Sequence, residues 1–213
     1  MINDVAAIVL AGGDSKRMGT DKNLIKLNNR KMIEVVIDNL SSTFTNIIVV
    51  TNSPEKLIIE NRANSVIHVL EDRFRSEEKN SLRGIFTGLD EISQQYGFVF
   101  AGDMPFINIF LVNAMAGIVE NEKWDVVIPK LEGYYEPLFA IYHQNCLPYM
   151  KKQLDKGNYK IINFFAEVNV QELSMNFCKK YDQELKSFFN VNTPEQLEMA
   201  KKYFESDKNG LLD

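Results

Sequence analysis

Residues 5–22 read VAAIVLAGGDSKRMGTDK, an unbroken run of six apolar residues followed by a polar, glycine-rich stretch. A short continuous apolar run is typical of a strand buried on both faces of a parallel sheet, so we expect a strand over residues 5–10. The glycines then fall where that strand ends. In open α/β sheets, ligands bind in the crevice beyond the carboxyl ends of the strands. The sequence therefore predicts a ligand-binding loop directly after the first strand.

The residue types in this loop suit an anion. Gly12, Gly13 and Gly19 tolerate positive φ and lack a Cβ, so the backbone can turn several N–H groups toward one phosphate. Positive charge is added by Lys16, Arg17 and Lys22. The stretch is neither a P-loop nor G-x-G-x-x-G. A glycine pair after a strand is also common in plain turns, and loop lysines are usually solvated, so composition alone leaves both readings open.

Length and composition set the class of protein. The chain has 213 residues, which fits one domain, taken here as residues 1–204 with a frayed tail over 205–213. A net charge of −5 argues against a general affinity for nucleic acid or anionic membranes. No signal peptide or membrane helix is indicated, so we expect a cytoplasmic protein. Cys146 and Cys178 are too far apart for a C-x-x-C motif and are expected to be reduced structural thiols.

Strand and helix patterns alternate along the chain. Apolar runs predict strands at 46–50, 66–70, 97–101 and 125–129, and helical periodicity predicts helices at 30–40, 84–92, 108–120 and 145–156. Right-handed crossovers place the first strands parallel, whereas the turn at 130–133 makes an extended run at 138–142 a candidate antiparallel strand. A short strand is predicted at 188–192, and Thr193 and Gln196 form a capping box for a last helix. The pattern predicts an α/β fold with a mostly parallel, Rossmann-like sheet.

Polar residues follow three of the predicted strands. Asp103, directly after the strand at 97–101, faces the same crevice as the glycine loop and is suited to hold a metal, although a turn or cap role is the alternative. Asn52 is a candidate contact for a base or ribose, or a turn residue. Asp72 is equally a nucleotide contact or a solvated acid. His68, between apolar neighbours, is expected to be a core residue.

The thirteen positions Leu10-Ala11-Gly12-Gly13-Asp14-Ser15-Lys16-Arg17-Met18-Gly19-Thr20-Asp21-Lys22 resemble the signature loop of the molybdenum cofactor guanylyltransferases, within the nucleotidyltransferase superfamily. Further segments match in the same order: Glu71-Asp72, Leu82 with Gly84, Gly102-Asp103-Met104-Pro105, Glu136-Pro137-Leu138-Phe139-Ala140, Gly157 and Phe189-Asn190-Val191-Asn192-Thr193-Pro194. The resemblance implies the three-layer nucleotide-diphospho-sugar transferase fold. One departure is Asn80-Ser81-Leu82, where family members often have Gly-Pro-Leu near the guanine.

The resemblance also implies a reaction. A GMP unit would pass from GTP to the terminal phosphate of molybdopterin, with pyrophosphate as leaving group. Attack of one anion on another makes charge neutralisation and positioning the main catalytic needs. Other biosynthesis proteins or recipient molybdoenzymes are possible partners, and Mg²⁺ is the implied cofactor.

Roles carry over to matching positions. The resemblance implies that the nucleotide is bound by Leu10, Ala11, Gly12, Gly13, Lys22, Asn52, Asp72, Leu82 and Asp103. Catalysis falls to Arg17, Lys22 and Asp103, with Asp103 on Mg²⁺. Asn190 and Asn192 would lie near the acceptor, where Asn192 is alternatively a cap residue. Tyr134, Tyr135 and Glu136 border the acceptor or belong to the core.

Alternatives remain at the level of function. A CTP-dependent molybdopterin cytidylyltransferase or another small-molecule nucleotidyltransferase shares these features. Outside the enzymes, a nucleotide-binding regulatory module without catalysis is possible, but such a module need not keep Arg17, Lys22 and Asp103.

Overall fold

The computed structural model describes residues 1–12, 25–27, 29–73, 80–121 and 123–209. The strands are β1 (Val5–Leu10), β2 (Lys26–Leu27), β3 (Arg30–Lys31), β4 (Asn46–Thr51), β5 (Val66–Glu71), β6 (Tyr96–Ala101), β7 (Val126–Leu131), β8 (Tyr134–Tyr135), β9 (Phe139–His143) and β10 (Val170–Ser174). The α-helices are α1 (Met32–Ser41), α2 (Ser81–Glu91), α3 (Ile109–Asn121), α4 (Leu147–Asp155), α5 (Met175–Tyr181) and α6 (Pro194–Asn209). Short 3₁₀ helices are η2 (Pro54–Lys56), η3 (Gln144–Cys146), η4 (Ile161–Glu167) and η5 (Lys186–Phe188).

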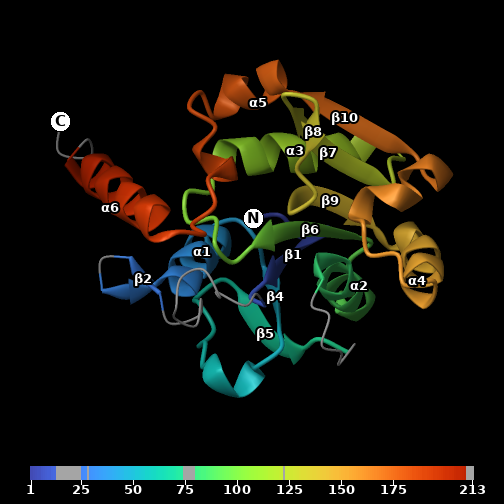
Figure 1. Ribbon diagram of the computed structural model, residues 1–213, viewed down its shortest axis with the longest axis horizontal. Helices are drawn as coiled ribbons and strands as arrows, with labels where there is room; N and C mark the ends of the chain where they lie inside the picture. The colour runs from blue at the N-terminus through green and yellow to red at the C-terminus, as the bar shows by residue number, and fades with distance from the viewer. Residues whose placement is uncertain (13–24, 28, 74–79, 122, 210–213) are drawn as a thin grey trace.

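One mixed sheet organises the molecule, with strand order β10-β7-β9-β6-β1-β4-β5 and β8 paired to β7 (Figure 1). β1 pairs in parallel with both β4 and β6, and β4 pairs in parallel with β5. β9 runs antiparallel to β6 and to β7, as the sequence predicted for residues 138–142. The chain moves from β1 outward to β5 and returns to β6 on the other side of β1. The strand order therefore reverses between β1 and β6, which is where doubly wound sheets bind ligands.

Helices cover both faces of the sheet. Successive side chains of a strand point to opposite faces. In β1, Val5, Ala7 and Val9 accordingly pack into a cluster with α1, α3 and α5, whereas Ala6 and Ile8 pack with α2, α4 and η4. The two clusters make the protein a three-layer sandwich and explain why β1 is apolar at every position.

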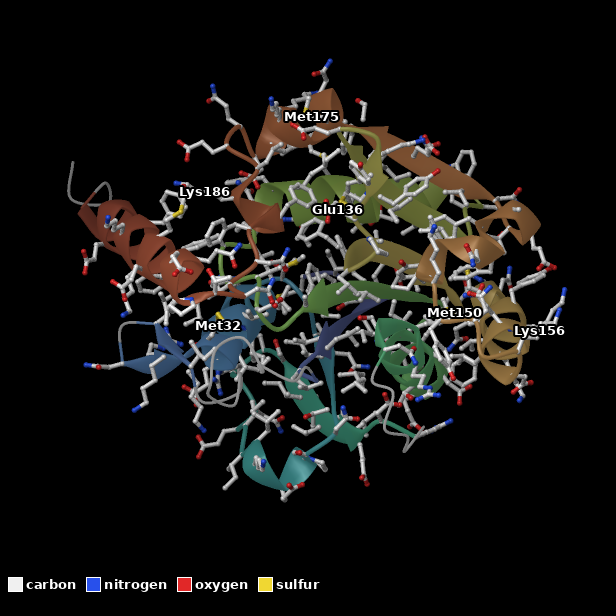
Figure 2. All side chains as sticks on the ribbon, in the orientation of Figure 1. Met32, Glu136, Met150, Lys156, Met175 and Lys186 are labelled. Atoms are coloured by element: carbon white, nitrogen blue, oxygen red, sulfur yellow. The ribbon has the colours of Figure 1, made fainter. Side chains whose placement is uncertain are left out.

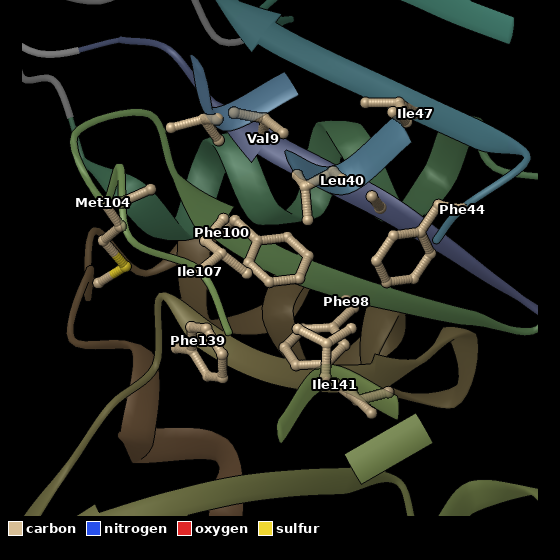
Figure 3. Packing of buried hydrophobic residues seen from close by; sticks show 14 of the residues in the cluster. Val9, Leu40, Phe44, Ile47, Phe98, Phe100, Met104, Ile107, Phe139 and Ile141 are labelled. Atoms are coloured by element: carbon tan, nitrogen blue, oxygen red, sulfur yellow. The ribbon is translucent and has the colours of Figure 1, made fainter. Parts of the chain in front are cut away.

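The first cluster is centred on aromatic rings (Figure 3). Phe98 and Phe100 of β6 stack with ring centroids 4.4 Å apart, and Phe44 and Phe139 meet both rings edge-on. All four side chains are fully buried. Burial of one such ring contributes about 1.5–3 kcal/mol, and the edge-to-face geometry adds to it, so this cluster fixes the position of β6.

Two glycines bring α2 unusually close to the sheet. A Cβ on Gly88 would lie 2.4 Å from Ile8 Cγ2, and a Cβ on Gly84 would lie 3.1 Å from Leu10 Cδ2. Real Cβ atoms essentially never approach to 2.4 Å, so the helix needs glycine at position 88, and a side chain at position 84 would require Leu10 to shift by a few tenths of an ångström. The close approach places the amino end of α2 beside the end of β1.

A third, smaller cluster attaches α6 to the hairpin of β2 and β3. Ile25, Leu27, Met32, Val191 and Ala200 are buried there together. In Figure 1, α6 lies at the side of the molecule next to β2. Among the described residues, no helix combines the length and apolar character that a membrane crossing requires.

Several boundaries and one strand differ from the predictions. Residues 188–192 form no strand: Phe188 ends η5, and its ring packs on Phe139, with centroids 4.9 Å apart, instead of joining the sheet. His68 is exposed rather than buried, because β5 is the edge strand of the sheet. The helix α6 extends to Asn209, and residues 210–213 of the expected tail lie outside the described residues.

Other expectations are confirmed. Gln196 Oε1 accepts from the backbone N–H groups of Asn192 and Thr193 at 2.7 and 3.1 Å, and Thr193 Oγ1 accepts from Gln196 N, which is the predicted capping box. Cys146 and Cys178 are free and buried thiols.

Candidate active site

A cavity of about 390 Å³ opens at the carboxyl ends of β1 and β6. It is lined by Leu10, Ala11, Gly12, Met32, Ile33, Ser81, Ala101, Gly102, Asp103, Leu138, Asn190 and Asn192. This volume lies within the range of small-molecule sites, and the position is the strand-order reversal of the sheet. Six of the predicted site residues therefore share one cavity: Leu10, Ala11, Gly12, Asp103, Asn190 and Asn192.

The start of the glycine loop is held by the neighbouring strands. Ala11 N–H donates to Val50 O at 2.8 Å, and Gly102 N–H donates to Leu10 O at 2.9 Å. A Cβ at Gly102 would lie 3.1 Å from Leu10 O, so glycine permits this close approach of the two strand ends. As a result, the loop after β6 reaches the same cavity as the loop after β1.

Asp103 is tied to the segment that carries the two asparagines. Val191 N–H donates to Asp103 O at 3.0 Å, although the residues are far apart in sequence. Asn190 Nδ2 donates to Phe188 O at 3.2 Å. This bond uses the amide nitrogen, and the oxygen Oδ1 is the acceptor atom of the side chain. One carboxylate and two amides thus line one side of the cavity.

The amino end of α2 contributes Ser81. Asn80 caps this helix, because its Oδ1 accepts from Arg83 N–H at 3.0 Å. Leu82, predicted as a nucleotide contact, is fully buried and packs against the sheet. Ser81 rather than Leu82 is therefore the residue of this segment that lines the cavity.

Asn52 and Asp72 do not line the cavity. Asn52 is exposed, and its Nδ2 lies 3.3 Å from where a Cβ on Gly12 would be, so it borders the glycine loop. Asp72 follows β5, and its Oδ1 accepts from Thr87 Oγ1 at 3.1 Å. Both lie at the carboxyl edge of the sheet, on the β4–β5 side of the cavity.

The predicted residues Gly13, Arg17 and Lys22 lie outside the described residues. Conversely, the apolar lining from Met32, Ile33 and Leu138 was not predicted, because apolar residues carry no chemical signal in a sequence. Met32, labelled in Figure 2, marks the side of the cavity next to the β2–β3 hairpin and α6.

The donor atoms at the cavity are hard oxygens. Asp103 supplies a carboxylate, and Asn190 supplies an amide oxygen. Within the ranges that the structure describes, no group of three or more His, Cys, Asp or Glu side chains is placed to hold a metal. These oxygens fit Mg²⁺, which favours one or two carboxylates together with phosphates and water.

The chain is similar to known proteins over nearly its whole length. The family model described as a MobA-like NTP transferase domain matches residues 7–171. A probable molybdenum cofactor guanylyltransferase of Natranaerobius thermophilus is 51% identical over 203 residues, covering 95% of this chain and 98% of the relative. A molybdenum cofactor guanylyltransferase of Desulfosudis oleivorans is 32% identical, covering 92% of this chain and 94% of the relative.

A solved structure agrees with these relatives. The molybdopterin-guanine dinucleotide biosynthesis protein A from Archaeoglobus fulgidus superposes with a TM-score of 0.81 at 28% identity, covering 94% of this chain and 99% of the other. Fold, sequence and the position of the cavity therefore point to one family. The chain belongs to the family of proteins with a MobA-like NTP transferase domain.

Proposed function

We propose that the protein transfers a GMP unit from GTP to molybdopterin or the molybdenum cofactor, releasing pyrophosphate and forming the guanine dinucleotide cofactor. The observation that carries the proposal is the cavity at the ends of β1 and β6, which combines the start of a glycine loop with Asp103, Asn190 and Asn192. The names of the relatives, at up to 51% identity among those compared, support the nucleotide and the acceptor.

Binding of the triphosphate falls to the glycine loop in this proposal. The backbone N–H groups of Gly12 and Gly13 would face the phosphates, whereas the N–H of Ala11 is donated to Val50 O, and Arg17 and Lys22 would stabilise the departing pyrophosphate. Removing one preorganised charge at such a site typically lowers turnover on the order of 10²-fold. Lys22→Ala is therefore expected to lose turnover on that scale while keeping its fold.

The acceptor side falls to Asp103, Asn190 and Asn192. Asp103 would hold Mg²⁺, which when bound neutralises charge on the phosphate oxygens. Asn190 Oδ1 would be a second oxygen ligand for this metal, and Asn192 would orient the acceptor phosphate for in-line attack on the α-phosphorus. The backbone hydrogen bond from Val191 N–H to Asp103 O fixes the position of the two asparagines relative to Asp103.

Residues on the β4–β5 side of the site would recognise the base. Asn52, Asp72 and the segment with Leu82 contact base or ribose in this proposal. Because Asn80-Ser81 replaces the Gly-Pro usual near the guanine, CTP is the second candidate nucleotide. A cytoplasmic location and transfer of the product to recipient molybdoenzymes remain predictions.

The proposal is tested with two measurements. In a thermal-shift panel of GTP, CTP, ATP and UTP with Mg²⁺, GTP is expected to stabilise most, since a ligand stabilises by RT ln(1 + [L]/Kd). A larger shift with CTP would overturn the guanylyl assignment.

The second measurement uses Asp103→Asn, which keeps the shape of the side chain and removes its charge. We expect the variant to lose Mg²⁺-dependent turnover while its melting temperature without nucleotide stays close to that of the wild type. If Asp103 only shaped the turn before Met104, the variant would lose stability and keep its turnover per folded molecule.

A further inference from the structure

Thr51, the last residue of β4, holds a buried hydroxyl between two loops of the site. The residue is 2% exposed. Its Oγ1 accepts from Ser53 N–H at 3.3 Å and lies 3.2 Å from the carbonyl oxygen of Ala11. A carbonyl can only accept, so the hydroxyl proton is donated to Ala11 O. Both hydrogen-bonding roles of this hydroxyl are thereby used.

The bond to Ala11 sets the orientation of the first peptide of the glycine loop. In a trans peptide, the C=O and the following N–H point in opposite directions. Since Ala11 O points to Thr51, Gly12 N–H points away from Thr51. Among the described residues none accepts a hydrogen bond from Gly12 N–H. Ala11 and Gly12 both line the cavity, so this N–H is available to an anion bound there.

Thr51 also connects the loops that follow the neighbouring strands. Its carbonyl accepts from Asp72 N–H at 2.9 Å, which anchors the loop after β5. Its hydroxyl anchors Ser53, next to Asn52, whose Nδ2 borders Gly12. The ends of β1, β4 and β5 are thus joined through one residue that has no contact with the cavity itself.

We propose that Thr51 is a positioning residue: through its hydroxyl it holds the peptide between Ala11 and Gly12 so that Gly12 N–H faces the nucleotide phosphates. The inference rests on the proposed function only for the identity of the phosphate ligand. A site for pyrophosphate or any nucleoside triphosphate would need the same peptide orientation.

The test compares three substitutions of one hydroxyl. Thr51→Val keeps the shape and removes the hydroxyl, Thr51→Ser keeps the hydroxyl, and Thr51→Cys replaces it with a weaker donor. Without the Thr51 hydroxyl, the hydrogen bond from Gly12 N–H to the charged phosphate should be lost. Loss of a hydrogen bond to a charged group corresponds to a change in affinity of about tenfold or more. Calorimetry with Mg²⁺–GTP and with Mg²⁺–pyrophosphate should therefore show about tenfold weaker binding by Thr51→Val, near-normal binding by Thr51→Ser and an intermediate loss by Thr51→Cys.

A matched control separates positioning from general destabilisation. Ser65 is 4% exposed, and its hydroxyl lies 2.7 Å from Phe44 O at the amino end of β5, on the edge of the sheet opposite the cavity. Ser65→Ala should lower the melting temperature and leave both affinities unchanged. If Ser65→Ala lost as much affinity as Thr51→Val, the effect would be general destabilisation and the proposal would fail.

Three further outcomes are distinguishable. Binding by Thr51→Val within twofold of the wild type for both ligands would overturn the positioning role while leaving the guanylyltransferase assignment intact. If the wild type bound pyrophosphate but not GTP, the proposed function would fail, and the pyrophosphate series would still decide the role of Thr51. Should Thr51→Val not fold, the order of affinities Thr51→Ser above Thr51→Cys decides it.

Discussion

Replacing Thr87 with valine removes a single buried hydroxyl that supports Asp72. Thr87 is 1% exposed, and its Oγ1 donates to Asp72 Oδ1 at 3.1 Å and accepts from Arg73 N–H at 3.4 Å. Valine has nearly the same shape, so no cavity is created. A hydrogen bond to a charged group contributes about 1.5–3 kcal/mol. For a chain of this size, that loss corresponds to a decrease in melting temperature of roughly 3–12 °C.

Urea denaturation measures the effect directly. The expected result is a lower midpoint with an unchanged m-value, because the same surface is exposed on unfolding. Thr87→Ser is the control: it keeps the hydroxyl and loses one methyl, for about 0.8 kcal/mol. A Thr87→Val protein within about 0.5 kcal/mol of the wild type would refute the reasoning, since such a change is typical of an exposed site.

Three further predictions concern packing and titration. Gly88→Ala places a Cβ 2.4 Å from Ile8 Cγ2, so the overpacking of about 1–3 kcal/mol should exceed the helix gain of roughly 1 kcal/mol; a variant more stable than the wild type in urea would contradict this. Burial raises the pKa of the half-buried Glu136 carboxyl (labelled in Figure 2) above its value in the unfolded chain. The protonated carboxyl therefore contributes its full stability below the unfolded-state pKa, and this stability is lost as pH rises through the folded-state pKa. Glu136→Gln should therefore gain stability over the wild type at pH 7 but not at pH 4, and an equal difference at both pH values would count against it. Burial raises the pKa of the Cys178 thiol to about 11 and that of Cys146 further, so an alkylating reagent at pH 8 should modify both only after unfolding, and rapid labelling of the folded protein would disagree.

The part of the fold that positions the site could be predicted from sequence. β1 and β6 are apolar at nearly every position because both of their faces are covered, and such runs stand out in a sequence. Their ends define where the glycine loop and Asp103 begin. Strand pattern and charge therefore predict that Asp103 lies beside the glycine loop, and Asp103 lines the cavity there.

Errors arose where burial depends on tertiary neighbours. His68 has apolar neighbours in sequence, but β5 is paired on one side only, and sequence pattern does not reveal which strand is at the edge. Residues 188–192 have the alternation of a strand, yet Phe188 packs on Phe139 while Val191 packs under α6. Their apolar side chains serve two different clusters, which a local pattern does not distinguish from one sheet face.

Hydrogen bonds that support the loops could not be predicted from the sequence either. Thr51 and Thr87 are ordinary β-strand and helix residues by type, and only the strand order brings their hydroxyls to Ala11 and Asp72. The close packing of α2 on the sheet likewise depends on Gly88, whose contact with Ile8 appears only in the folded structure. Such supporting residues carry no motif, because many side chains of similar size could fill the same role in another arrangement.

The most direct test of the account is a product assay with purified protein, molybdopterin, Mg²⁺ and GTP carrying a label on the α-phosphate. The account predicts that the label enters a molybdopterin guanine dinucleotide and that one pyrophosphate is released for each dinucleotide formed. CTP supplied at the same concentration should give much less product. Preferential labelling from CTP, or GTP binding without any transfer to molybdopterin, would contradict it.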